Sequence, residues 1–250
     1  MFVAQRKDGT DTKNGDLTIT QLDFAGKQLG YMHLLGFGHG VSFGAQGEGS
    51  ATYLWTEVDV DGDGYGKRLG RFKFVSGTTL KSTSTAIKKF TPVPDATLHT
   101  CQIDPVYNRL VVRYHVKDIG KHIAVYDLGA AKKGDFSKPL VNFKQPIPER
   151  MAKRFQGYAA YGQYLYLMWG DSYDASGGVL NSQLVAVDMN TGKIVQGPVM
   201  TKAGSTLKFR EAEGLAIYQK ANGEVRLFLG FASGDPGDRR SNLFFKNELV

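Results

Sequence analysis

Five pairs of short apolar runs recur along this chain at a nearly constant interval, and no other feature restricts its fold as strongly. The first runs of the pairs start 51 to 61 residues apart, and each second run starts 13 to 20 residues after the first. The runs are rich in Val, Ile, Leu, Tyr and Phe and are bounded by Gly, Asn and Asp, as β-strands are. They are FVAQRK with LTITQLD, YLWTEV with LGRFKFV, LVVRYHV with IAVYDLG, YLYLMWG with LVAVDMN, and VRLFLGF with LFFKNEL. Such a period indicates a repeated β unit.

Each repeat contains two further strand candidates. A short segment precedes most pairs, as in GHGVSFG, HTCQIDP, QGYAAYG and EGLAIYQ, and another run follows most of them, as in KQLGYMHLL, LVNFKQ and KIVQGPVM. Four antiparallel strands in about 55 residues describe the blade of a β-propeller. We therefore predict an all-β, five-bladed β-propeller, with inner strands near Val41, Thr100, Tyr158 and Leu215. A β-sandwich is the alternative, but it does not account for five pairs in step.

Both chain ends are predicted to fall inside an incomplete blade. The first pair lacks an inner strand before Phe2, and the last pair lacks an outer strand after Val250. Either the two ends share one incomplete sheet, or upstream residues complete the ring. We expect residues 1–250 to form a single β-propeller domain that is missing upstream residues of a longer chain.

The charge and the apolar content limit the classes of partner. A formal charge of +7 favours an anionic partner. The basic residues are scattered, and no Lys/Arg block of the kind that binds nucleic acid is present. No run of about 18 apolar residues predicts membrane insertion, and the first residues lack the apolar core of a signal peptide. The single cysteine, Cys101, cannot form an internal disulfide and is expected to be a small buried residue.

One acidic loop resembles the start of a calcium site. In TEVDVDGDGYGKR, the residues Asp59, Asp61 and Asp63 precede Gly64 as in the first half of an EF-hand loop. The second half does not match, because Lys67 and Gly70 stand at positions nine and twelve, where a calcium loop has acidic or carboxylate ligands. We predict an acidic hairpin in which Ca²⁺ is optional and no cofactor is required.

Polar residues also cluster where inner strands are predicted to start. His39 in GFGHG is predicted to face the central channel, or to make a structural hydrogen bond. Glu211 and Glu213 in FREAEGLAIY precede another inner strand, and carboxylate pairs can act as ligands or as acid and base. A salt-bridged pair with Arg210 is the alternative. The sequence WGDSY, with Asp171, lacks the α/β context of a serine hydrolase.

The turn SGDPGDRRSN carries Arg239 and Arg240, whose planar side chains are suited to bidentate phosphate binding. A plain exposed turn is the alternative for this segment. No His-x-x-x-His or His-Glu spacing of the metal-ligand type is present among the five histidines.

Several stretches together resemble one known β-propeller domain. They are LGFGHGVSFG, YLWTEVD with GYGKRLGRFKF, FQGYAAYGQYLYLMWG, FREAEGLAIY and LFLGFASGDPGDRRSNLFFKNELV. The resemblance is to the domain shared by a staphylococcal phage receptor-binding protein, by actinobacterial and phage proteins named for teichoic acid biosynthesis protein C, and, more loosely, by helveticin J bacteriocins. It covers nearly the whole chain. It implies a five-bladed propeller that attaches to bacterial cell-wall glycopolymers, and it supplies no catalytic residue set.

We interpret the chain as the receptor-binding domain of a phage tail or tail-like particle, in the virion tail or extracellular. Its predicted ligand is an anionic cell-wall glycopolymer, such as a wall teichoic acid or a surface polysaccharide. Sugar recognition needs aromatic faces and planar polar groups on rigid strands. The predicted ligand-binding residues are His39, Trp55, Glu57, Arg113, Gln156, Tyr158, Tyr161, Trp169, Arg210 and Glu213.

Two alternative functions remain open at this point. The same fold could carry a glycan depolymerase of the glycoside hydrolase or phosphodiesterase type, with Glu211, Glu213, Asp171 or His39 as acid and base. It could also be a helveticin-like bacteriocin. Tail proteins are usually trimeric, so a homo-oligomer within a tail is one expectation, although no residue pattern marks an interface.

Overall fold

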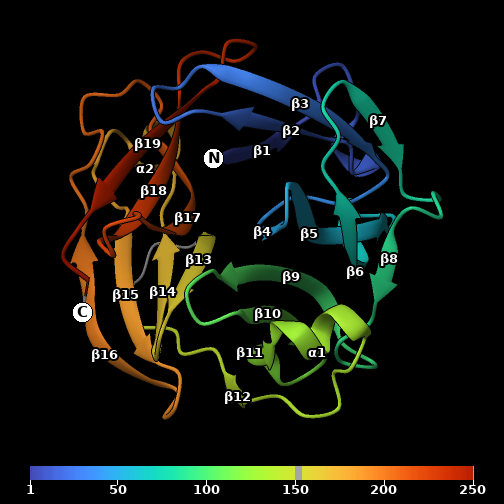
Figure 1. The fold of residues 1–250 in the computed structure, drawn as a ribbon. Helices are drawn as coiled ribbons and strands as arrows, with labels where there is room; N and C mark the ends of the chain where they lie inside the picture. The colour runs from blue at the N-terminus through green and yellow to red at the C-terminus, as the bar shows by residue number, and fades with distance from the viewer. Residues whose placement is uncertain (150–153, 250) are drawn as a thin grey trace. The chain divides into compact units, whose positions relative to one another are not determined.

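The computed structural model describes residues 1–149 and 154–249, and over this part nineteen strands form five sheets (Figure 1). The first sheet has the order β1-β2-β3-β7, and the second has the order β4-β5-β6-β8. Their strands are β1 (Phe2–Arg6), β2 (Leu17–Leu22), β3 (Gln28–Leu35), β7 (Thr78–Lys81), β4 (Gly44–Glu48), β5 (Ala51–Val60), β6 (Gly66–Lys73) and β8 (Lys88–Phe90).

The third sheet has the order β12-β11-β10-β9, the fourth β13-β14-β15-β16 and the fifth β17-β18-β19. Their strands are β9 (Thr97–Asp104), β10 (Arg109–Val116), β11 (Gly120–Asp127), β12 (Val141–Lys144), β13 (Phe155–Tyr161), β14 (Tyr164–Trp169), β15 (Gln183–Asp188), β16 (Lys193–Met200), β17 (Glu211–Gln219), β18 (Val225–Ser233) and β19 (Arg240–Lys246). The helical segments are short: η1 (Thr12–Asn14), α1 (Leu128–Lys133) and α2 (Tyr173–Ser176).

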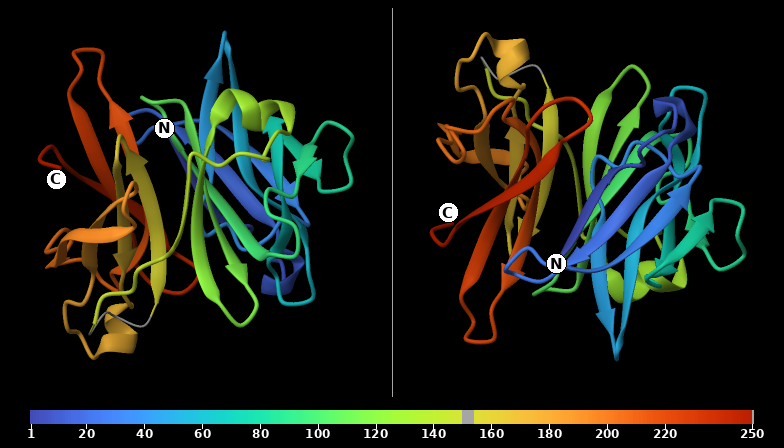
Figure 2. Two further views of the ribbon diagram at one scale, coloured as in Figure 1. Left: turned by 90° about the horizontal axis from the view of Figure 1, so that it is seen from below. Right: turned by 90° about the horizontal axis from the view of Figure 1, so that it is seen from above.

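The chain divides into two compact units. One comprises Met1–Ile103 and Arg109–Asn142, and the other comprises Asp104–Asn108 and Phe143–Val250. The first unit holds the first two sheets and nearly all of the third, and the second unit holds the fourth and fifth sheets, drawn in yellow to red in Figure 2. The expectation that residues 1–250 form one domain stays a prediction.

Alternating side chains build the core of the first unit in two clusters. One lies between the first and second sheets, and the other joins the second and third sheets. The fully buried members include Leu34, Phe37 and Phe72 in one cluster and Trp55 and Leu110 in the other. Cys101 is buried in the second cluster as predicted, and burial raises the pKa of its thiol. This thiol is therefore a small core group.

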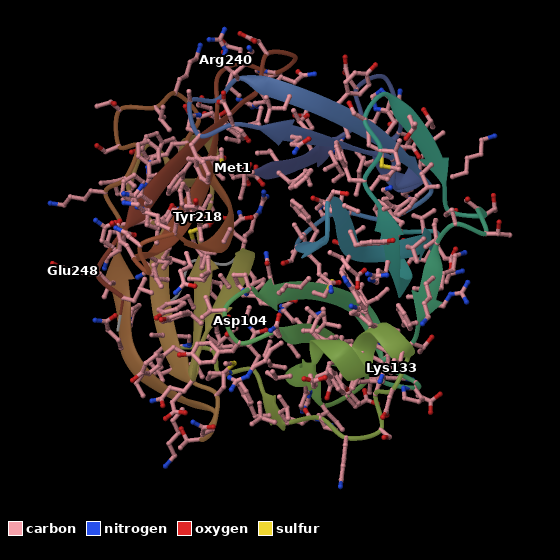
Figure 3. All side chains as sticks on the ribbon, viewed as in Figure 1. Met1, Asp104, Lys133, Tyr218, Arg240 and Glu248 are labelled. Carbon is pink, nitrogen blue, oxygen red and sulfur yellow. The ribbon has the colours of Figure 1, made fainter. Side chains whose placement is uncertain are left out.

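The second unit has its own core between the fourth and fifth sheets. Met168, Ala212, Leu229 and Phe231 are buried there. In β18 the buried core residues alternate with half-buried ones, as expected for a sheet whose one face packs on the core. The buried Asp104 carboxylate also belongs to this unit, where it accepts hydrogen bonds from the N–H groups of Val106 and Gly162 at 3.0 Å each (Figure 3).

Three predicted inner strands lie where the repeat placed them, and one does not. Thr100, Tyr158 and Leu215 lie in β9, β13 and β17. The segment around Val41 is not a strand, because the strand near it, β4, begins at Gly44. The backbone N–H groups of His39, Gly40 and Val41 donate instead to a buried carboxylate, described below.

Two sheets also differ from the predicted unit of four antiparallel strands. Over the described residues the fifth sheet has three strands. In the first sheet the fourth strand, β7, runs parallel to β3, with Met32 opposite Thr78 and Leu35 opposite Lys81. Because β7 follows β6 of the second sheet along the chain, the periodicity alone did not assign it to the first sheet. None of the helices in the described part is long and apolar enough to span a membrane.

Candidate functional site

Each of the two sheets in the second unit has a β-bulge near the start of its first strand, which is β13 in one sheet and β17 in the other. In β13 and β14, Phe155 pairs with Trp169 and Gly157 pairs with Met168, so Gln156 is the extra residue of the bulge. In β17 and β18, Ala212 pairs with Phe231 and Gly214 pairs with Gly230, so Glu213 is the extra residue. A bulge redirects the side chain of its extra residue. Gln156 and Glu213 therefore occupy equivalent positions, as the repeat predicted.

The two bulges lie close together because glycine follows each of them. A β-carbon built on Gly157 would lie 2.9 Å from the Cα of Gly214. No larger residue at position 157 fits this contact, so the glycine allows β13 and β17 to approach backbone to backbone. The contact places Gln156 and Glu213 on neighbouring strands at the same end of the second unit.

Charged residues from three elements surround these bulges. The Arg154 side chain lies 3.4 Å from Asp171 and 3.4 Å from Glu211, and both carboxylates are mostly buried. The Gln156 amide donates to the Gly170 carbonyl at 2.8 Å, and the Gly170 N–H donates to the Arg154 carbonyl at 3.0 Å. These contacts join the start of β13 to the residues after β14 and to the first residue of β17.

Glu213 is the titratable group of this cluster with the largest change in proton affinity. Burial of its carboxyl group, reinforced by the Glu211 carboxylate, raises the pKa of Glu213 to about 7, and Arg239 opposes this shift. The residue as a whole remains exposed. Arg239 itself stacks over the Phe209 ring, with its guanidinium carbon 3.3 Å from the ring centroid. We call Arg154, Gln156, Asp171, Glu211, Glu213 and Arg239 the paired-bulge cluster.

Arg210, predicted as a ligand-binding residue, directly precedes β17 and is fully buried. Its guanidinium donates to the Thr201 carbonyl at 3.0 Å, to the Ala203 carbonyl at 3.0 and 2.8 Å, and to the Ser182 hydroxyl at 2.9 Å. The backbone of Phe209 and Arg210 has positive φ values of 70° and 40°. The buried guanidinium therefore holds a strained turn in place at the start of β17.

Glu57, another predicted ligand-binding residue, lies in β5, and its side chain holds the loop before β4 in place. It is 1 % exposed, and its carboxylate accepts hydrogen bonds from the N–H groups of Gly40 at 2.7 Å and Gly66 at 2.6 Å. Burial raises the pKa of Glu57, and the backbone N–H groups of Gly66, Gly40, His39 and Val41 oppose this shift. The carboxylate thus replaces strand pairing for the segment before β4.

His39 lies on this loop with an exposed side chain. Its ring stacks on Tyr65, with centroids 5.2 Å apart and an interplanar angle of 25°. Loss of solvent and the nearby Arg6 charge lower the pKa of His39, so its neutral form is favoured near pH 7. A neutral imidazole stacked on a phenol presents an apolar face and two polar atoms to a ligand.

The Asp59 loop is a turn held by its own contacts. Asp59 forms ion pairs with Arg68 and with Lys89, and the Asp61 carboxylate accepts from the N–H groups of Asp63 at 2.8 Å and Tyr65 at 2.9 Å. The described residues contain no group of three or more His, Cys, Asp or Glu that could hold a metal ion. The three aspartates therefore do not form a ready calcium shell, and the expectation that calcium is optional stays a prediction.

The remaining predicted ligand-binding residues are largely buried. Trp55 stacks on Phe90 with centroids 5.2 Å apart and donates to Gln46 at 3.2 Å. Tyr158, Trp169 and Arg113 are also buried. Their predicted contacts with a ligand stay predictions.

Sequence reasoning missed two residues of these sites, Arg154 and Tyr65. Arg154 directly precedes β13, but relative to the two bulges it corresponds to Glu211, so the repeat offered no signal for an arginine there. Tyr65 had no signal either, because its contact with His39 depends on how the loop folds.

A family model described as "Phage 5-bladed beta propeller receptor binding platform domain" matches residues 1–245. The match confirms the five-bladed, all-β propeller that the repeat predicted.

Among curated proteins, the chain is 28% identical over 236 residues to "Putative major teichoic acid biosynthesis protein C" of Bacillus subtilis (strain 168). The aligned part covers 90% of this chain and 51% of that protein, so the chain spans about half the length of this relative.

Among solved structures, "Tail fiber of Staphylococcus aureus phage P68" is similar with a TM-score of 0.77 and 21% identity, over 98% of this chain and 46% of that chain. At this identity the likeness concerns the fold. A GH43_1 enzyme from Xanthomonas citri, solved with xylose, matches 83% of this chain and 69% of its own at 15% identity and a TM-score of 0.45, too low to support a functional argument.

Proposed function

The chain belongs to the family of phage five-bladed β-propeller receptor-binding platform domains, and from this membership we propose that it binds an anionic cell-wall glycopolymer on the host surface. In this proposal the domain acts in the virion tail or outside the cell, and its ligand is a wall teichoic acid or a surface polysaccharide. Binding, and not cleavage, is its main activity.

The paired-bulge cluster is the observation that carries this proposal. It brings an amide, two guanidinium groups and three carboxyl groups to one end of two packed sheets. Planar groups of these kinds form paired hydrogen bonds with sugar hydroxyls and with phosphate oxygens. Because they stand on strands and bulges and not on a long loop, they are already held in position before a ligand binds.

Charge and relatives add support. The formal charge of +7 favours association with an anionic polymer. The relatives are named as a tail fibre of a staphylococcal phage and as a putative teichoic acid biosynthesis protein, and both names point to the bacterial envelope.

A sedimentation assay with purified cell walls tests this function. The protein should co-sediment with walls that carry their glycopolymer and should stay in solution when the glycopolymer has been removed. Glu213→Ala and Gln156→Ala should each weaken the association by about tenfold or more, as expected for a central contact. Glu248→Gln, an exposed charge change in the same unit, is the matched control. Equal binding to both wall preparations would disprove the proposal.

A depolymerase is the second candidate, and one observation favours it. Glu213 has a pKa raised to about 7 beside the Glu211 carboxylate, which is the arrangement of an acid next to a base. The same assay separates the two functions. Soluble glycan or phosphate fragments that accumulate with the wild type and not with Glu213→Gln would establish hydrolysis, and retention without fragments would establish binding alone.

A further inference from the structure

A cavity of about 390 Å³ lies between the fourth and fifth sheets of the second unit. Its first wall belongs to the fourth sheet, where Leu184 of β15 lies opposite Val199 of β16. Its second wall belongs to the fifth sheet, where Leu227 of β18 lies opposite Lys246 of β19. Residues opposite each other across a ladder share one side of the sheet. The cavity therefore extends the core between these two sheets toward β16 and β19, the last strands of their sheets.

The cavity remains open beside β16. The fourth sheet has four strands and the fifth has three over the described residues, so β16 has no counterpart in the fifth sheet (Figure 1). All eight residues of β16 are exposed. Val199 and Met200, at its end, are 48 % and 41 % exposed although they line a concave surface. Ligand cavities have volumes of roughly 300–1,000 Å³, and apolar walls favour an apolar group over water.

Two lysines give the border of the cavity a positive charge. Lys202 lies two residues after β16, Lys246 is the last residue of β19, and both side chains are exposed. Within the described parts of the chain, neither ammonium group forms an ion pair with a carboxylate. Glu248 is exposed at the same border and pairs with neither lysine, so a net positive charge remains.

The backbone that carries both lysines is held in place. The Thr201 N–H donates to the Ser182 carbonyl at 2.9 Å, and the Thr201 carbonyl accepts from the buried Arg210 guanidinium at 3.0 Å. These two bonds fix the segment before Lys202. Lys246 is fixed by the pairing of β19 with β18. Because the backbone is already ordered, less conformational entropy is lost when a ligand binds.

We propose that this cavity binds a small anionic amphiphile. Its apolar part packs against Leu184, Val199 and Leu227. Its anionic group pairs with Lys202 and Lys246. The apolar walls favour a ligand with a hydrocarbon part over a bare ion, and the two lysines favour an anionic head over a neutral or cationic one. This inference goes beyond the proposed function, because the described residues that line the cavity include none of the paired-bulge cluster.

Calorimetry with octyl phosphate as the probe tests this site. Butyl phosphate has a shorter chain and should bind about tenfold more weakly or worse, because each buried methylene group adds to the affinity. Octyl glucoside has the same chain with a neutral head, and it should also bind more weakly. No binding of octyl phosphate would overturn the site, and so would equal affinities for octyl and butyl phosphate.

Tryptophan substitutions on β16 test the cavity itself. Val199→Trp should fill the cavity and weaken the binding of octyl phosphate by about tenfold or more. Val195→Trp is the matched control, because Val195 is 49 % exposed on the same strand and does not line the cavity. It should bind within about twofold of the wild type. Both positions are exposed, so neither substitution disturbs the core. Equal effects of the two substitutions would contradict the proposal.

A double variant tests the two charges. Lys202→Gln combined with Lys246→Gln should weaken the binding of octyl phosphate by about tenfold, as expected when two exposed charge contacts are lost, and should leave the binding of octyl glucoside unchanged. Damage to the fold would weaken both probes. Lys193→Gln is the control, because Lys193 is an exposed lysine at the other end of β16. An equal loss for the two probes in the double variant would contradict the role of the lysines.

Vesicles distinguish a free amphiphile from a lipid in a bilayer. Co-sedimentation with phosphatidylglycerol vesicles that is lost in Val199→Trp would support the site with a bilayer lipid as its ligand. Octyl phosphate binding without association with these vesicles would support the site with a free amphiphile. If Val199→Trp binds both octyl phosphate and the vesicles as the wild type does, the cavity is not the site.

Discussion

Gly66 donates its backbone N–H to the buried carboxylate of Glu57 across 2.6 Å. A β-carbon on Gly66 would lie 2.6 Å from the Glu57 β-carbon, so only glycine fits at this position. The contact fixes the end of the β5–β6 hairpin to the loop that carries His39, whose neighbour Gly40 donates to the same carboxylate at 2.7 Å. One carboxylate therefore organises two segments of the first unit.

Glu57→Gln should destabilise the first unit by about 2–4 kcal/mol, because a donor NH₂ group would face backbone N–H groups in a buried site. Thermal and urea unfolding of the two proteins measures this difference. Glu48→Gln is the control, since Glu48 is an exposed residue of the same unit, and its effect should be much smaller. Similar losses of stability in the two variants would mean that the Glu57 carboxylate is dispensable.

The Gly157–Gly214 contact predicts that alanine at position 157 and alanine at position 214 differ in their effects on stability and binding. A β-carbon at position 157 would lie 2.9 Å from backbone, whereas a β-carbon at position 214 meets no atom within 4 Å. Gly157→Ala should destabilise the second unit by about 1–3 kcal/mol, as overpacking does, and should weaken cell-wall binding by moving the two bulges apart. Gly214→Ala should have little effect on either quantity. The reverse order of effects would refute the contact.

Glu213 should make the stability of the protein depend on pH between about 4.5 and 7. Its pKa rises from its ordinary value of 4.5 to about 7 in the folded chain, so the folded state holds a proton over this range that the unfolded state releases. Stability should therefore fall as the pH rises through this range. Melting temperatures of the wild type and of Glu213→Gln, which lacks the titrating group, measure the effect, and the variant should show a flatter pH profile. Identical profiles would count against the raised pKa.

Calcium removal should leave the fold unchanged. The Asp59 carboxylate is already paired with Arg68 and Lys89, and Asp61 is bonded to backbone N–H groups, so no ion is needed to satisfy the turn. Addition of a chelator should not shift the melting temperature. A fall of more than about 5 °C, or over 1 kcal/mol for a domain of this size, would show that the loop holds a structural cation.

The repeat predicted the strands better than it predicted the roles of the residues between them. Thr100, Tyr158 and Leu215 lie in strands because each stands in a short run bounded by turn residues, and such runs are visible in a sequence. The prediction of a strand at Val41 was wrong, because backbone N–H groups of this segment bond to Glu57. Glu57 is 17 residues away from Gly40, and no local pattern encodes such a contact.

The same limit applies to the candidate sites. Gln156 and Glu213 both stand at the start of a predicted inner strand, and they occupy equivalent bulges in the structure, because equivalent positions in a repeat fold alike. Arg210, in contrast, looks like a surface arginine in FREAEG, and only the fold shows that Ser182, Thr201 and Ala203 surround it. A sequence motif gives the residue type and the element, but burial depends on the segments that pack over it.

The parallel strand β7 has a mechanical consequence for the first unit. β7 lies between β6 and β8 along the chain, yet it pairs with β3, and the Gly77 and Ser82 N–H groups extend that pairing to Tyr31 and Leu35. The first two sheets are therefore interlaced, and a pulling force cannot unzip one while the other stays intact. In a single-molecule stretching experiment the two sheets should therefore rupture in one event.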